Sequence, residues 1–500
     1  MSNLATFLTS SAASTPEAVA VQLDDYTMTY RQLDDAAARM VTVLREQGYQ
    51  RGDRVAVMLP NVPAFVVVYY AVLRAGGVVV PMNPLLKGRE VRFYLGNSGA
   101  SIIVAWHACL EAAIEGARDA GTTVIAVDEG FDGRVGAAEP DTDVVELNAE
   151  DTAVILYTSG TTGHPKGAEL THANLIHNTA VSADTLFNIT PDDVIMGCLP
   201  LFHAFGQTCA LNATIRGGAT LTLLARFDPA KALSMILRDG VTIFEGVPTM
   251  YSALIEARRR EPVDTSTLRV CVSGGAALPV EVLRTFETTF DAVILEGYGL
   301  SETSPVASFN RPDRERKAGS IGLPIDGVEF RLIDDVGEPV SVGDRGEIAI
   351  RGQNVMKGYW GLPDETAEAF VDGWFRTGDI ATVDEDGYYY LVDRKKDLII
   401  RGGFNVYPRE IEEVIYEHPD VLEAAVIGLP HGTLGEEVGA AVVLRPDASG
   451  TVEDVKAFVK QRVAAYKYPR VVWLEGELPK GPTGKILRRN VHAPEGDSPG

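Results

Sequence analysis

The sequence predicts an α/β protein with a large N-terminal domain of mostly parallel sheets packed with helices, a β-rich subdomain, and a small mobile α+β C-terminal domain. Short β-branched runs alternate with helical patterns through most of the chain, which is typical of parallel sheets covered by helices. Near residue 340 the pattern changes to strand pairs with turn residues around them, and a compact mixed segment follows residue 397.

The first elements are predicted from apolar runs and the residues that interrupt them. Residues 55–59 form a continuous apolar run and are predicted as a buried strand. Residues 63–74 are predicted as a helix, because proline opens the segment and Gly76 and Gly77 end it. Residues 153–157 and 268–272 repeat the strand type, and we expect a helix after each of them.

The later elements belong to smaller sheets. Residues 346–351 and 387–392 are predicted as hairpin strands. Pro408 opens a helix with one apolar face, and Thr451 forms a capping-box-like start for a helix through Val463. Further strands are predicted at residues 438–444 and 471–474. From this change of pattern we expect a large N-terminal domain over 1–393, a hinge over 394–396 and a small, lid-sized C-terminal domain over 397–500.

Composition excludes some classes of protein. The net charge of -24 over 500 residues argues against a protein held on nucleic acid or anionic lipid by a general positive field. The four cysteines are scattered without a CxxC pair, as expected for incidental thiols in a reducing compartment. The N-terminus lacks a signal-peptide pattern, and the most apolar stretch, residues 62–80, contains proline, arginine and glycines. We therefore expect a cytoplasmic protein without a transmembrane segment.

The strongest local motif covers residues 157–167. It follows a predicted strand and combines three glycines, four hydroxyl side chains and Lys166. Glycines let backbone N–H groups turn toward a phosphate, while hydroxyls and lysine add donors. No Gly-Lys-Ser/Thr ends the loop, so it is not a Walker A motif. A flexible linker is the alternative, but Pro-Lys-Gly directly after the loop disfavours it.

This loop resembles the phosphate loop of the adenylate-forming superfamily, which contains acyl-CoA synthetases, plant coumarate ligases, firefly luciferase and nonribosomal adenylation domains. The similarity extends from residues 28–30 to Lys485, with the motifs in the family's order. It implies an AMP-forming acid–thiol ligase that uses ATP, Mg²⁺ and coenzyme A.

The resemblance also implies the nucleotide site. Tyr298 would stack on adenine, Glu302 would bind Mg²⁺, Asp379 would accept from the ribose hydroxyls and Arg394 would be a second contact. A surface salt bridge is the alternative role for Arg394. The implied ATP-binding residues are Thr158, Ser159, Gly160, Thr161, Thr162, Gly163, Lys166, Gly274, Gly275, Ala276, Gly297, Tyr298, Gly299, Ser301, Asp379 and Arg394.

The catalytic residues implied by the resemblance are Lys485, His203, Thr161 and Glu302. Lys485 would reach both the carboxylate and the α-phosphate, where a cation aligns two anions and stabilises the charge that develops at phosphorus. A solvated basic tail is the alternative for Lys485, and a core histidine the alternative for His203. The expected walls of the acyl pocket are His203, Phe205, Thr208, Gly299, Leu300 and Val306.

The expected reaction has two steps joined by a domain rotation about Lys396. After the adenylate has formed, the small domain would remove Lys485 and bring Gly402, Gly403 and Phe404 to line the coenzyme A channel. An acyl carrier protein is the alternative acceptor, and a non-catalytic nucleotide-binding relative is the alternative function.

The acid itself is predicted less directly. Residues 199–211 contain no aspartate that could pair with a substrate ammonium group, which disfavours amino acids. A medium- or long-chain fatty acid is favoured over an aryl acid of the coumarate or cinnamate type. The expected partners are small molecules, with no nucleic acid, and the chain is expected to be a monomer or a homodimer.

Overall fold

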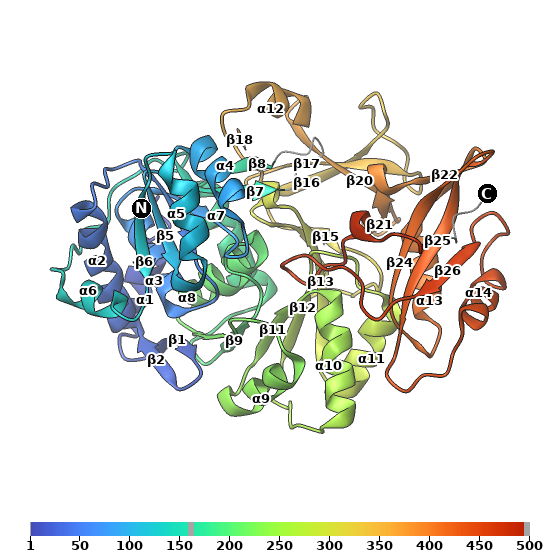
Figure 1. Ribbon diagram of the computed structural model, residues 1–500, viewed down its shortest axis with the longest axis horizontal. Helices are drawn as coiled ribbons and strands as arrows, with labels where there is room; N and C mark the ends of the chain where they lie inside the picture. The colour runs from blue at the N-terminus through green and yellow to red at the C-terminus, as the bar shows by residue number, and fades with distance from the viewer. Residues whose placement is uncertain (1, 159–164, 495–500) are drawn as a thin grey trace.

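The α/β prediction is confirmed by the computed structural model, which describes residues 2–158 and 165–494. The described strands form four sheets. Figure 1 shows the N-terminal half at the left and the C-terminal residues, in orange and red, as a smaller body at the right. Among the described residues, none of the helices is long and apolar enough to cross a membrane.

Two largely parallel sheets form the N-terminal domain. One has nine strands in the order β15-β14-β13-β12-β11-β9-β10-β1-β2, and the other has seven in the order β18-β8-β7-β4-β3-β5-β6. Their strands are β1 (Val19–Leu23), β2 (Tyr26–Thr29), β3 (Arg54–Met58), β4 (Val78–Pro81), β5 (Ile102–Trp106), β6 (Thr123–Val127), β7 (Thr152–Thr158), β8 (Lys166–Thr171), β9 (Val194–Gly197), β10 (Thr220–Leu223), β11 (Ile243–Gly246), β12 (Val270–Ser273), β13 (Val293–Gly299), β14 (Val306–Phe309), β15 (Leu323–Pro324) and β18 (Gly358–Tyr359).

One helix lies buried between these two sheets. In α3 (Pro63–Arg74) every residue from Phe65 to Arg74 is buried, and the helix shares one core with Val55 of β3 and Ile195 of β9. A helix that is apolar on all sides requires such a central position. The outer face of the nine-stranded sheet is covered by α9 (Pro229–Asp239), α10 (Pro248–Arg260) and α11 (Val280–Phe290), and that of the seven-stranded sheet by α4 (Gly88–Ser98) and α5 (Leu110–Arg118).

Two five-stranded sheets complete the chain. The first joins β16 (Val328–Ile333), β17 (Gly346–Gly352), β19 (Phe370–Val371), β20 (Trp374–Val383) and β21 (Tyr389–Arg394). The second joins β22 (Ile399–Arg401), β23 (Phe404–Val406), β24 (Val421–His431), β25 (Gly435–Leu444) and β26 (Val471–Leu474), and it packs on α13 (Pro408–Tyr416) and α14 (Val452–Lys460). The expected hinge, 394–396, thus falls between two different sheets, and rotation about it stays a prediction.

Two local expectations differ from the structure. The segment after the phosphate loop is strand β8 rather than a helix, because its residues pair antiparallel with β7 and the capping box of Thr171 begins the helix only at His172. Gly297, Tyr298 and Gly299 continue β13 and pair with β14. The helix after Thr451 ends at Lys460, short of the expected Val463. The four cysteines are free and buried.

Candidate functional site

Three residues expected to hold the nucleotide meet through their side chains. Tyr298 of β13 donates its hydroxyl hydrogen to Asp379 Oδ2 of β20, with 2.7 Å between the oxygens. Arg394 Nε lies 3.2 Å from Asp379 Oδ1, because the register of β20 and β21 places these two residues opposite each other. Burial raises the pKa of Tyr298 well above its usual value, and the Asp379 carboxylate adds to this, so the hydroxyl stays protonated.

A second cluster lies directly after β13, around Glu302 in the short helical turn Ser301–Thr303. The Tyr359 hydroxyl donates to Glu302 Oε1 at 3.0 Å, and burial raises the pKa of the Glu302 carboxyl. Lys166 Nζ lies 5.2 Å from the centre of the Tyr359 ring, a cation–π contact. Tyr359 therefore connects the expected metal residue with the phosphate loop. Sequence reasoning missed it, since its two-residue strand gives no recognisable pattern.

Glu302 fits a Mg²⁺ ion that takes most of its ligands from ATP. In nucleotide sites Mg²⁺ commonly binds one or two carboxylates, and phosphate oxygens and water complete its coordination. In the part of the chain that the structure describes, no three His, Cys, Asp or Glu side chains come together as a metal cage. The buried Glu302 carboxylate, held at one oxygen by Tyr359, suits the arrangement shared with a nucleotide.

The described ends of the phosphate loop face each other. Thr158 ends β7 and Lys166 begins β8, and the Thr158 hydroxyl donates to the Lys166 carbonyl at 3.4 Å. The remaining residues assigned to this loop, Ser159, Gly160, Thr161, Thr162 and Gly163, lie outside the described residues. The loop therefore connects two antiparallel strands, and Lys166, which follows it, contacts the Tyr359 ring.

Lys485 reaches this region from the C-terminal domain. Its carbonyl accepts from the Gly481 N–H at 2.8 Å, which closes a tight loop. Burial, and next the Arg394 cation, lower the pKa of Lys485 to about 8. Burial and then the Lys485 cation lower the pKa of His203 to about 4. Lys485, His203 and Arg394 thus lie within electrostatic reach of one another, although they come from distant parts of the sequence.

The loop after β12 has the expected position between a strand and helix α11. Gly275 has a φ of +78°, in the left-handed region that favours glycine. The Gly274 N–H donates to the Gly246 carbonyl at 3.3 Å, and Ala276 follows in the same loop. A Cβ atom on Gly274 would lie 3.0 Å from the Phe205 ring, so the loop and this expected acyl-pocket residue are in close contact.

The expected walls of the acyl pocket fall on two joined segments. Thr208, in the helical turn Gly206–Asn212, donates its hydroxyl to the Ser304 carbonyl at 2.9 Å. A Cβ atom on Gly299 would lie 1.8 Å from the Pro305 carbonyl oxygen, so only glycine fits there. The structure thus joins the segment of His203, Phe205 and Thr208 to that of Gly299, Leu300 and Val306. Contact of these residues with an acyl group stays a prediction.

The residues expected to line the coenzyme A channel lie in the hairpin of β22 and β23. Gly402 and Gly403 have φ values of +57° and +86°, and the Gly402 N–H donates to the Leu434 carbonyl at 2.8 Å. Phe404 is 56% exposed and stacks on Tyr466 with 4.8 Å between ring centres. These contacts all lie within the C-terminal domain, and the contact of these residues with coenzyme A stays a prediction.

The expected hinge is bounded by ion pairs. Lys395 Nζ lies 2.6 Å from Asp335 of the N-terminal domain. Arg488 Nη1 lies 2.9 Å from Asp393 Oδ1 and 3.5 Å from Asp397 Oδ2, and its Nε lies 2.9 Å from Glu412 Oε1. Lys396 is exposed between these anchors. Sequence reasoning missed Arg488, because nothing separates it in sequence from the basic residues around it.

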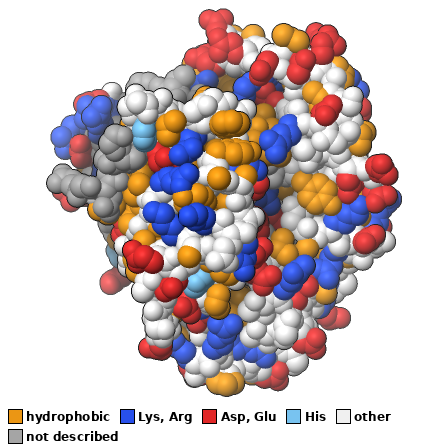
Figure 2. Space-filling model, turned by 90° about the vertical axis from the view of Figure 1, so that its right-hand side faces the viewer, with side chains coloured by type: hydrophobic (Ala, Val, Ile, Leu, Met, Phe, Trp, Pro, Cys, Tyr) orange, Lys and Arg blue, Asp and Glu red, His pale blue; other side chains and the backbone are white. Residues whose placement is uncertain are grey.

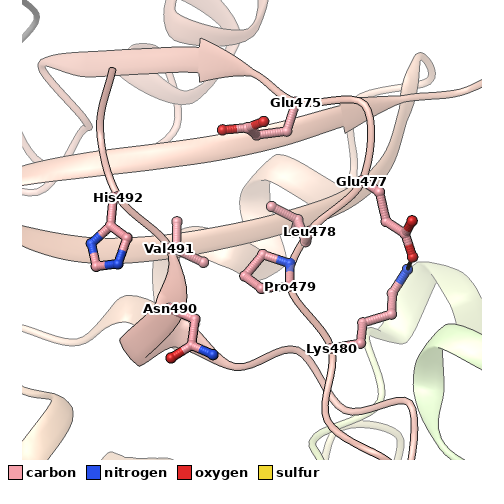
Figure 3. A pocket seen from close by; sticks show the side chains of 8 residues that line it. All are labelled: Glu475, Glu477, Leu478, Pro479, Lys480, Asn490, Val491 and His492. Carbon is pink, nitrogen blue, oxygen red and sulfur yellow. Dashed lines mark ion pairs between the residues drawn. The ribbon is translucent and has the colours of Figure 1, made fainter. Parts of the chain in front are cut away.

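The outer face of the C-terminal domain carries mixed charge. Figure 2 shows basic and acidic side chains interspersed over this face, rather than a field of one sign. A hollow of about 530 Å³ lies on this domain. Figure 3 shows the side chains that line it, which are Glu475, Glu477, Leu478, Pro479, Lys480, Asn490, Val491 and His492. Lys480 Nζ lies 2.9 Å from Glu423 and 3.5 Å from Glu477, so its charge is already balanced.

Comparison with family models gives two adjacent matches. A model described as AMP-binding enzyme matches residues 8–360, and one described as AMP-binding enzyme C-terminal domain matches residues 410–485. The first match includes Tyr298, Glu302 and Tyr359, and the second ends at Lys485.

Named relatives match nearly the whole chain. It is 40% identical to a feruloyl-CoA synthase from an Amycolatopsis species, with 96% of each chain covered. It is 37% identical to a long-chain-fatty-acid–CoA ligase from Bacillus subtilis, covering 98% of this chain and 94% of that protein. The crystal structure of ATP-bound MatB from Rhodopseudomonas palustris is similar with a TM-score of 0.91 and 34% identity, over 98% of this chain and 97% of MatB. The apo structure of the same protein matches over equal shares with a TM-score of 0.80.

Proposed function

The chain belongs to the AMP-binding enzyme family, and from this membership we propose that it is an ATP-dependent acid–thiol ligase that joins a carboxylic acid to coenzyme A. The observation that carries the proposal is that Lys485 lies within electrostatic reach of His203, of Arg394 and of Asp379, the acceptor of the Tyr298 hydroxyl. The names of the relatives support coenzyme A as the acceptor. The higher similarity to ATP-bound than to apo MatB supports an orientation suited to the first half-reaction.

In the first half-reaction a carboxylate oxygen attacks the α-phosphorus of ATP. The bond from that phosphorus to the oxygen bridging to the β-phosphate breaks, which gives acyl-AMP and pyrophosphate. The chain contributes mainly position and charge: Asp379 accepts from the ribose, Lys166 approaches the phosphates, and Lys485 neutralises the two anions that meet. Mg²⁺, held in part by Glu302, would neutralise phosphate charge when bound.

In the second half-reaction the sulfur of coenzyme A attacks the acyl carbon of the adenylate. A carbon–sulfur bond forms, the bond from acyl carbon to phosphate oxygen breaks, AMP leaves, and the thiol proton passes to solvent. His203, whose pKa of about 4 keeps it uncharged near neutral pH, would position the acyl group without adding a second cation beside Lys485. Rotation about Lys396 would bring Gly402 and Gly403 to the adenylate, where their missing side chains leave room for pantetheine.

For the acid substrate we propose two candidate classes. A medium- or long-chain fatty acid is our first candidate, in line with the Bacillus relative. An aryl acid is the second, and the feruloyl-CoA synthase relative favours it. The close contact of Phe205 with Gly274 is compatible with either, because an aromatic wall can pack on a chain or a ring.

The decisive test is a panel of acids scored for pyrophosphate and AMP release with and without coenzyme A. Decanoate, palmitate, ferulate, benzoate and phenylalanine cover the candidate classes. We expect AMP release that depends on coenzyme A with a fatty or aryl acid, and none with phenylalanine. Acid-dependent AMP release that requires a carrier protein and is not supported by coenzyme A would overturn the choice of acceptor, and no pyrophosphate release with any acid would overturn the proposed function.

A further inference from the structure

The first turn of α10 contacts the backbone directly before Lys485. The Thr249 hydroxyl donates to the Gly484 carbonyl at 2.8 Å, although 235 residues separate the two in the chain. Thr249 belongs to the N-terminal domain and Gly484 to the C-terminal one. This hydrogen bond therefore crosses the domain boundary one peptide unit from the lysine proposed to neutralise the reacting anions.

The backbone conformation of Gly484 allows this contact to form. Its φ of +85° is a conformation that side chains rarely adopt, and it turns the loop so that the carbonyl faces α10. A Cβ atom on Gly484 would lie 3.2 Å from Val247 Cγ2 and 3.4 Å from Thr249 Oγ1. The backbone of the Lys485 loop is thus seated closely against residues 247–249.

The same face of α10 makes a second contact with the C-terminal domain. Glu256 lies seven residues after Thr249, about two helical turns along the same face, and forms an ion pair with Arg445. On the neighbouring helix, the Val280 N–H donates to Glu413 Oε2 of α13 at 3.3 Å. These contacts hold the domain as a whole, whereas the Thr249 contact holds the Lys485 loop itself.

We propose that Thr249 is a positioning residue for adenylation, which fixes the Lys485 loop through the Gly484 carbonyl and releases it when the C-terminal domain rotates. This inference rests on the proposed function. Because the hydrogen bond exists only while Gly484 sits on α10, its contribution belongs to the half-reaction that uses Lys485. Thioester formation takes place after the loop has left, so it gains nothing from Thr249.

The test compares the two half-reactions in Thr249→Val, which keeps the shape of the side chain and removes the donor. Adenylation is followed as pyrophosphate release with decanoate or ferulate, whichever acid the full-length enzyme uses, and thioester formation as AMP release from the matching acyl-AMP and coenzyme A. We expect kcat of adenylation to fall about 5- to 10-fold, the effect of one hydrogen bond, with the KM for ATP little changed. Thioester formation should keep its rate, and Thr249→Ser should restore adenylation.

Thr267→Val is the matched control, since the Thr267 hydroxyl donates to the Val241 carbonyl at the same 2.8 Å, within the N-terminal domain. We expect it to leave both half-reactions unchanged. Equal losses of both half-reactions in Thr249→Val, no loss in either, or failure of Thr249→Ser to restore adenylation would overturn the inference. Failure of the proposed function is distinct, because the unaltered enzyme would then release no pyrophosphate with any acid.

Discussion

Adenylation should lose rate as the pH rises through the pKa of Lys485. Burial and the Arg394 cation lower this pKa to about 8 in the free protein. Lys485 neutralises two anions only while protonated, so the active fraction falls with increasing pH. Between pH 7 and pH 9 the protonated fraction of a group with this pKa falls about tenfold. We expect kcat/KM for ATP, which reports the free enzyme, to show that decline when pyrophosphate release is followed from pH 6 to pH 10.

Two variants identify the titrating group. Lys485→Arg keeps a charge over this whole range, so its residual activity should show no decline near pH 8. Arg394→Gln removes a cation that lowers the Lys485 pKa, and its decline should move to higher pH, at whatever overall rate remains. A profile that still falls near pH 8 in Lys485→Arg would refute the assignment to Lys485, and an unmoved decline in Arg394→Gln would refute the electrostatic coupling.

Three further outcomes follow from single residues. Tyr359→Phe removes the donor to Glu302 Oε1 and should raise the KM for Mg·ATP about fivefold, measured by Mg²⁺ titration at fixed ATP; an unchanged KM would count against Glu302 as the metal residue. Glu245 is fully buried, neither of its carboxylate oxygens has a hydrogen-bond partner in the described structure, and burial raises its pKa far above the ordinary value. Because the unfolded chain releases that proton at lower pH than the folded one, Glu245 lowers the free energy of unfolding as pH rises above about 4.5. In urea unfolding, Glu245→Gln should therefore become more stable relative to the unaltered protein from pH 5 to pH 8. A stability difference that does not change with pH would contradict the raised pKa of Glu245. Gly299→Ala forces a Cβ atom against the Pro305 carbonyl and should cost about 1–3 kcal/mol of unfolding free energy, whereas Gly136→Ala, with open space around it, should be near neutral.

The sequence predicted the structure most accurately where one residue type has one conformational effect. Proline at Pro63 and the glycine pair after Ala75 were enough to predict α3 with the bounds that the structure has, Pro63–Arg74. The fold class followed from the alternation of strand and helix patterns, and the family from the order of its motifs.

Prediction failed where partners distant in sequence decide the outcome. Strand β8 was expected as a helix, because local sequence does not reveal its antiparallel pairing with β7 and β18. Tyr359, Thr249 and Arg488 gave no local signal, since each acts on a site residue through a partner supplied by the fold.

The burial of α3 determines how the molecule should unfold. Because this helix has no polar face that could be exposed to water, it is stable only while both large sheets enclose it. Neither sheet can therefore separate from it without exposing apolar side chains of the helix. The amide hydrogens of α3 should therefore exchange only when the whole N-terminal domain unfolds, as one cooperative unit. The C-terminal sheet has its own core around Ile411 and Val438, so its amides can exchange in an earlier, separate opening that leaves the nucleotide-binding strands intact.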